Sequence, residues 1–156
     1  MAKQVLDNLF VGTDADCGMN FDFTIHACKT CHQKRIGYSK SLPQLHPHYL
    51  ILEDPKDLYL NMVDMAKLSP IYTDPIMKVA LNFIDKYISQ GSILIHCNQG
   101  MSRSAGIALL YMAVKGYLPK TAYDSAKSSF MKIYPLYNPG TGVDNYLRDN
   151  WSKFVK

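Results

Sequence analysis

The sequence lacks any apolar run of the length that a membrane-spanning helix needs. The apolar stretch of a secretory signal peptide is likewise missing from its first residues, MAKQVLDNLFVG. It contains no internal repeat and no low-complexity segment, and its basic residues form no run long enough to indicate nucleic-acid binding. We therefore expect a cytoplasmic protein whose partners include neither a membrane nor nucleic acid.

The sequence also has few cysteines and a small net charge. The four cysteines stand at positions 17, 28, 31 and 97, and without a secretory signal they are expected to be reduced thiols rather than a disulfide framework. The net charge of +4 suits an anionic substrate, although a solvated basic face explains it more simply. With 47% hydrophobic residues in 156, the composition indicates one globular domain, residues 1–156, and we expect a monomer.

Hydrophobic patterning predicts strands that alternate with helices. The predicted strands are residues 8–12, 23–28, 57–63 and 92–97. The predicted helices are residues 74–91, 102–114, 119–131 and 142–154, with Asp74 as the N-cap of the first and Pro75 at its first helical position. Residues 29–55 carry prolines and many polar residues and are expected to be mostly loop. This order predicts an α/β fold with a central, mostly parallel sheet of four or five strands flanked by helices.

The loop from Cys97 to Arg103 lies between a predicted buried strand and a predicted buried helix, where α/β sheets form their sites. If the backbone N–H groups of Asn98 to Ser102 curl around one centre, they form an anion-sized cradle, and Gly100 allows the tight turn that this needs. The helix N-terminus and the Arg103 guanidinium add positive charge. Donors that favour a bound dianion also favour a thiolate at Cys97, so the predicted chemistry is phosphoryl transfer to sulfur followed by hydrolysis.

The segment HCNQGMSRSAG resembles the phosphate-binding signature of cysteine-dependent protein phosphatases, and its SRS ending resembles the dual-specificity branch. The resemblance extends from about residue 8 through the C-terminal helices. It implies that Cys97 is the nucleophile, Arg103 clamps the phosphate, Ser104 assists thiolate departure and His96 braces the loop. It also implies no cofactor and no metal. The other implied phosphate-binding positions are Asn98, Gln99, Gly100, Met101 and Ser102.

The leaving group of a phosphate ester needs a proton donor, usually a carboxylic acid on a loop that faces the cradle. Asp74 is better explained as an N-cap, Asp54 lies in a turn, and Asp57 lies at the entry end of its strand. Asp64 follows the exit end of that strand, on the edge of the sheet where the cradle forms. Its distance upstream of Cys97 resembles the family's general-acid position, so Asp64 is the predicted acid.

The motif Cys28-x-x-Cys31-His32 formally matches a c-type haem attachment site, but that chemistry needs an export context and a distant axial ligand. A zinc site that includes Cys17 and His26 is a second alternative. The simplest interpretation is that Cys28 ends a strand as a buried structural thiol. Some relatives in the family use a cysteine on a comparable strand to form a reversible disulfide with the nucleophile, so Cys28 is a candidate redox partner of Cys97.

The resemblance implies a phosphorylated protein as the substrate. The variable loop positions Asn98, Gln99, Met101 and Ser102 carry no charge, which disfavours a polyphosphorylated inositol head group. The compact chain favours a shallow site that admits phosphoserine and phosphothreonine as well as phosphotyrosine. The alternatives are a phosphatase that acts on a phosphoinositide, an RNA 5′-phosphate or a glucan, and a module that docks phosphoproteins without turnover.

Overall fold

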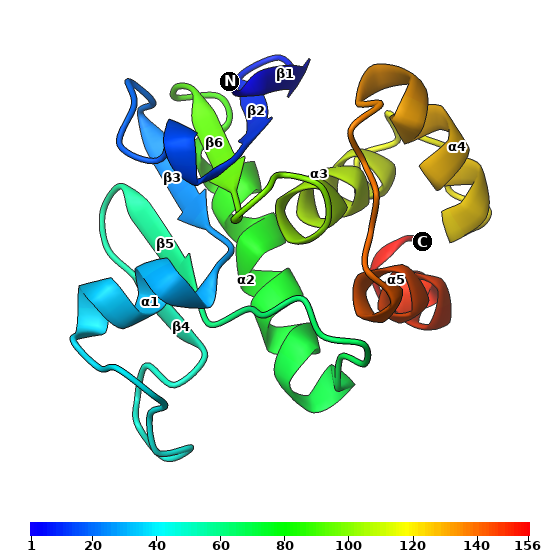
Figure 1. The fold of residues 1–156 in the computed structure, drawn as a ribbon. Coiled ribbons are helices and arrows are strands. Elements are labelled where there is room, and N and C mark those ends of the chain that lie inside the picture. Colours follow the sequence, from blue (N-terminus) through cyan, green and yellow to red (C-terminus); the bar gives the residue numbers. More distant parts are fainter.

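A six-stranded mixed sheet forms the centre of the computed structural model, which describes residues 1–156 (Figure 1). In chain order its strands are β1 (Lys3–Leu6), β2 (Leu9–Gly12), β3 (Phe23–His26), β4 (Ile51–Glu53), β5 (Asp57–Leu60) and β6 (Ile93–His96). Across the sheet the order is β1-β2-β6-β3-β5-β4. The four inner strands are parallel, and β1 and β4 pair antiparallel at the two edges. The predicted α/β class is confirmed.

Five helices accompany the sheet: α1 (Lys29–Ile36), α2 (Pro70–Tyr87), α3 (Arg103–Val114), α4 (Tyr123–Ile133) and α5 (Thr141–Phe154). Helix α1 packs against β5, whereas α3 packs against β2, β6 and the other three long helices (Figure 1). The residues of β6 are all buried, and so are those of α3 apart from its last. The strand and the helix on either side of the Cys97–Ser102 loop therefore form the rigid centre of the molecule. None of the helices combines the length and the apolar character that crossing a membrane requires.

The first long helix begins earlier than predicted. Helix α2 begins at Pro70 with Ser69 at the N-cap, so Asp74 is not a cap and Pro75 lies inside the helix. The Asp74 carboxylate instead accepts hydrogen bonds from Tyr146 and Lys153 of α5. The local sequence around Asp74 is typical of a helix start, but its side chain makes a tertiary contact with α5 instead.

The expectation that residues 29–55 are mostly loop was wrong over two segments, α1 and β4. Helix α1 has no apolar face, so its sequence gives no helical period. It ends at Gly37, which adopts the left-handed conformation with φ of 95°. His32 is buried and donates from Nε2 to the His48 carbonyl at 2.8 Å, which ties the helix to the following loop. The sheet has six strands rather than the predicted four or five. The prediction missed the short edge strands β1 and β4.

Candidate active site

The Cys97–Ser102 loop leaves the buried end of β6 and enters α3 at the carboxyl edge of the parallel strands. It encloses a small cavity of about 240 Å³. The cavity is lined by Asp64, Cys97, Asn98, Gln99, Met101, Ser102, Arg103 and Asn138. The fold thus brings together Asp64 and the Cys97–Arg103 segment, as the sequence predicted. The Cys97 residue is only 2% exposed, so this cavity is its access to solvent.

Several donors around the cavity have no partner within the chain. The backbone N–H groups of Gln99 to Ser102 donate to no acceptor in the protein. The Nε atom of Arg103 is buried and also lacks a partner. Neighbouring unpartnered N–H groups beside a buried guanidinium N–H without a partner form a site for an anion with several acceptor oxygens.

The Arg103 guanidinium is held in place by two hydrogen bonds. Its Nη1 donates to the Met62 carbonyl at 3.0 Å, and its Nη2 donates to Oδ1 of Asn98 at 2.6 Å. The amide of Asn98 in turn donates to Asp14 at 2.8 Å. The side chain is therefore fixed before any ligand binds, and its Nε–H remains available.

The loop rests on the end of β2 and on α4. Gly100 has φ of 72°, and a Cβ atom at this position would lie 2.9 Å from the Gly12 carbonyl oxygen. The Tyr134 hydroxyl donates to the Gly100 carbonyl at 2.7 Å. Burial, with a smaller contribution from Cys97, raises the pKa of Tyr134 to about 12, so this hydroxyl stays a donor at neutral pH. Only glycine fits the loop at position 100.

Ser104 faces the thiol of Cys97 from the first turn of α3. The two heteroatoms are 3.1 Å apart, and both residues are buried. The hydroxyl can therefore donate to a thiolate on Cys97. No other side chain comes as close to the sulfur among the hydrogen-bonded pairs of the structure.

Asp64 follows β5 and is exposed at the rim of the cavity. Its carboxylate packs against Gly140 at the N-cap of α5, where any side chain would collide with it. The Gly140 N–H donates to the Ser102 hydroxyl at 3.0 Å. The segment before α5 therefore joins the loop that carries Asp64 to the Cys97–Ser102 loop.

Sequence reasoning missed Asn138 and Tyr134. The Asn138 N–H donates to the Met101 carbonyl at 2.9 Å, and the residue lines the cavity. The turn-rich stretch that contains Asn138 is visible in the sequence, but no local signal places it beside a loop about 40 residues upstream.

Gly142, in the first turn of α5, offers a test of how tightly the Asp64 loop is held. A Cβ at this position would collide with the Met65 backbone carbonyl, which cannot rotate away as a side chain can. We expect Gly142→Ala to lower the free energy of unfolding by about 1–3 kcal/mol, measured by urea denaturation. The control is Thr141→Ala at the exposed neighbouring position, and equal stability of the two variants would contradict the prediction.

His96 and Cys28 lie behind the loop rather than in the cavity. His96 is fully buried, and burial together with the neighbouring His26 lowers the pKa of His96 to about 4. Cys28 is buried at the N-cap of α1, not in a strand. A hydrogen bond from the Cys31 thiol lowers the pKa of Cys28 to about 7. Both thiols are free and no hydrogen bond joins them, so a disulfide between Cys28 and Cys97 stays a prediction.

No protein-family model matches the chain. It is 29% identical over 133 residues to the MAP kinase phosphatase with leucine-rich repeats protein 1 of Dictyostelium discoideum. That match covers 84% of this chain but only 14% of the relative's length. The chain therefore spans only a small part of the length of this relative.

Solved structures match over nearly the whole chain. The crystal structure of DUSP15 aligns with a TM-score of 0.67 at 20% identity, covering 96% of this chain and 86% of that one. The human tyrosine phosphatase-like serine/threonine/tyrosine-interacting protein aligns with a TM-score of 0.69 at 18% identity, covering 99% and 98%. The Yvh1 phosphatase domain from Chaetomium thermophilum aligns with a TM-score of 0.65 at 18% identity, covering 97% and 95%.

The chain therefore has the cysteine-phosphatase fold in the form found in dual-specificity phosphatases. Within that fold it resembles DUSP15 and the phosphatase domain of Yvh1, which confirms at the level of architecture the resemblance seen in the sequence.

Proposed function

We propose that this protein is a cytoplasmic, monomeric phosphatase with one catalytic domain, residues 1–156, which hydrolyses phosphotyrosine and phosphoserine or phosphothreonine in proteins. The observation that carries the proposal is that one small cavity is lined by Cys97, by loop residues whose N–H groups have no partner and by Arg103, whose Nε has none. A phosphoryl group carries the oxygens that such donors need, and the sulfur lies where it can attack phosphorus.

In the first step the Cys97 thiolate attacks phosphorus, so that a P–S bond forms while the P–O bond to the substrate breaks. The loop N–H groups and Arg103 stabilise the charge on the three equatorial oxygens. Asp64, protonated at the rim of the cavity, gives its proton to the departing alkoxide or phenoxide.

In the second step water attacks the phosphocysteine. The Asp64 carboxylate accepts the proton of that water, and the P–S bond breaks to release inorganic phosphate. The Ser104 hydroxyl, 3.1 Å from the sulfur, donates to the thiolate as it leaves. The chemistry at phosphorus needs no metal and no cofactor, because the protein's own donors neutralise the charge.

The shape and charge of the cavity favour a phosphorylated side chain over a polyphosphate. A volume of about 240 Å³ is small, and neither Asn98, Gln99, Met101 nor Ser102 adds a second charge for a second phosphate. The Dictyostelium relative is named as a MAP kinase phosphatase, which is consistent with a protein substrate.

A docking module without turnover is the second candidate. It is favoured by the match to the human protein that is named phosphatase-like and interacting rather than a phosphatase. This chain nevertheless has a cysteine, an arginine and a serine in hydrogen-bonding positions within one site, as catalysis requires.

The test is phosphate release from two peptides of one sequence, carrying phosphotyrosine or phosphothreonine, and from a soluble inositol polyphosphate. We expect turnover of both peptides and at least tenfold lower kcat/KM with the inositol compound. Faster turnover of the inositol compound would overturn the assignment to protein substrates. Binding of the peptides without turnover by the wild type would favour the docking module.

Replacing Asp64 by asparagine tests the proton donor. We expect Asp64→Asn to lower kcat on the phosphotyrosine peptide by about 10²-fold, the usual contribution of general acid catalysis. Since Asp64 must be protonated in the first step, the wild-type rate falls as pH rises, and this basic limb of the pH–rate profile should disappear in the variant. The effect should be smaller with para-nitrophenyl phosphate, whose leaving group needs less protonation.

The matched control is Asp149→Asn, an exposed carboxylate on α5 outside the cavity. It should keep both the rate and the pH profile. An Asp64→Asn variant that keeps the wild-type basic limb on the peptide would assign the proton transfer to another residue.

A further inference from the structure

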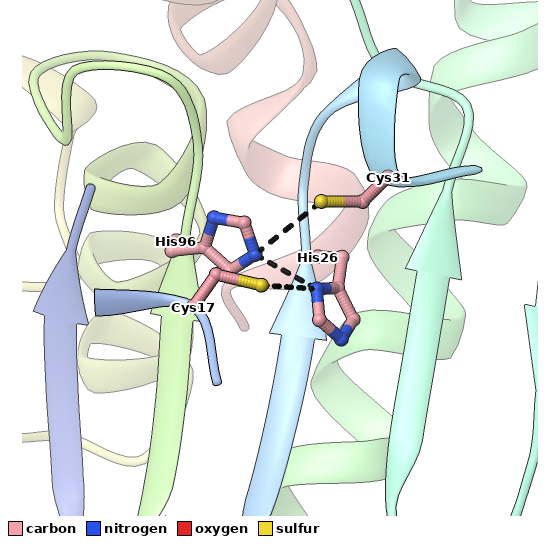
Figure 2. Close-up of side chains that lie close together, drawn as sticks. All are labelled: Cys17, His26, Cys31 and His96. Carbon is pink, nitrogen blue, oxygen red and sulfur yellow. Dashed lines mark hydrogen bonds between the residues drawn. The ribbon is translucent and has the colours of Figure 1, made fainter. Parts of the chain in front are cut away.

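Four side chains of the types that bind metal ions meet behind the Cys97–Ser102 loop (Figure 2). They are Cys17, His26, Cys31 and His96, whose ligand atoms all lie within 4.8 Å of one another. His26 ends β3, His96 ends β6, and Cys31 belongs to α1, while Cys17 follows the short 3₁₀ helix after β2. Four separate segments thus direct two thiols and two imidazoles at one point.

The distances are close to those around a tetrahedral metal ion. Nδ1 of His26 lies 2.8 Å from Nε2 of His96 and 3.6 Å from the sulfur of Cys17. The sulfur of Cys31 lies 3.9 Å from Nε2 of His96. Zinc bound at about 2.3 Å from sulfur and about 2.1 Å from nitrogen separates its ligand atoms by roughly 3.3–3.8 Å. Shifts of about half an ångström in the side chains would complete the tetrahedron.

The surroundings of His26 match those of a metal ligand. Its Nε2 donates to the Asp57 carboxylate at 2.8 Å. In the neutral ring this bond places the proton on Nε2 and leaves Nδ1 as an acceptor that faces the cluster. A carboxylate behind a histidine ligand orients the ring and makes it more basic.

His96 has an unexplained polar atom that a metal would account for. Its Nδ1 is buried without a hydrogen-bond partner, 3.6 Å from a carboxylate oxygen of Asp14. When Nδ1 of His26 carries no proton, Nε2 of His96 is the donor in the contact between the two rings. With Nε2 bound to a metal, the proton would move to Nδ1 and point at the Asp14 carboxylate.

We propose that Cys17, His26, Cys31 and His96 bind one Zn²⁺ ion as a closed structural site. Binding would release the two thiol protons to solvent, and no oxidation or reduction is involved. All four positions are filled by protein, which is typical of structural rather than catalytic zinc. Since His96 directly precedes Cys97, the ion would tie the base of the phosphate loop to β3, α1 and the segment after β2.

Zinc content of the purified chain tests this site, and it does so independently of phosphatase activity. We expect about one zinc per chain by elemental mass spectrometry after dialysis against Zn²⁺ and then against metal-free buffer. The Cys17→Ser/Cys31→Ser double variant should lose at least tenfold of that zinc. The matched controls Cys28→Ser and Cys97→Ser each remove a cysteine outside the proposed ligand set and should retain it.

Cobalt substitution of the Cys97→Ser protein supplies a second measurement that does not depend on the folding of the double variant. Bound Co²⁺ should show the visible absorption of tetrahedral coordination and thiolate-to-cobalt charge transfer. Absence of zinc, an octahedral cobalt spectrum, or equal zinc in the ligand and control variants would overturn the proposal. A Cys17–Cys31 disulfide in the freshly purified wild type would also overturn it.

Discussion

Replacing Cys97 by serine should lower kcat/KM on phosphopeptides by at least about 10⁴-fold. The cavity is built to hold an anion, but a serine hydroxyl gives up its proton far less readily than a thiol and makes a much weaker nucleophile. Ser104, 3.1 Å from the sulfur, can stabilise a thiolate, but its hydroxyl cannot remove the proton of an alcohol at position 97. Phosphate release from the phosphotyrosine peptide measures the loss.

The same variant should still bind the peptide, because the loop N–H groups and Arg103 do not depend on the sulfur. Isothermal titration of Cys97→Ser with the phosphorylated and the unphosphorylated peptide checks this, and only the phosphorylated form should bind. Activity within tenfold of the wild type would show that Cys97 is not the nucleophile, and the proposed mechanism would fail with it.

Arg103→Lys should lower kcat/KM by about 10³-fold, the scale of losing a preorganised donor to the transition state. A lysine has one compact charge and cannot donate to Met62 and Asn98 while also presenting Nε–H to the cavity. These two hydrogen bonds hold the arginine side chain in place. The lysine variant therefore loses both the hydrogen bonds and the fixed position of the positive charge. We expect the loss mainly in kcat, measured with the same peptide.

The matched control is Arg35→Lys, since Arg35 is paired with Asp54 on the surface and lies outside the cavity. It should keep activity within about twofold, as expected for an exposed ion pair. An Arg103→Lys variant with less than a tenfold loss would mean that positive charge alone suffices and that the fixed position of the guanidinium contributes little.

The centre of the site could be predicted from sequence because its parts are contiguous. Cys97 to Ser104 follow a buried strand and enter a buried helix, so one local segment contains the thiol, the loop donors, the arginine and the serine. Asp64 could be placed from topology, since parallel strands end at the same edge of a sheet, and the family resemblance indicated the same residue.

The remaining features depend on contacts between distant segments. Tyr134 and Asn138 reach the loop only because α4 packs against α3, and no local pattern indicates that. Asp74 has the signature of an N-cap but binds α5. Helix α1 is held by contacts such as that of His32 with the His48 carbonyl, which leave no period in the sequence.

The position of β6 also governs how the chain can fold. Strands β2 and β3 follow each other in the sequence but do not pair, because β6 lies between them. During synthesis both strands therefore emerge with unpaired edges. The sheet can close only when residues 93–96 follow, 67 residues after the end of β3 and 81 after the end of β2. Pairing between strands so far apart in the sequence is slow. Until it occurs, the unpaired strand edges can pair with other chains. The strand that delivers the nucleophile is thus the last of the sheet to arrive, so the catalytic loop forms only as the whole sheet is completed.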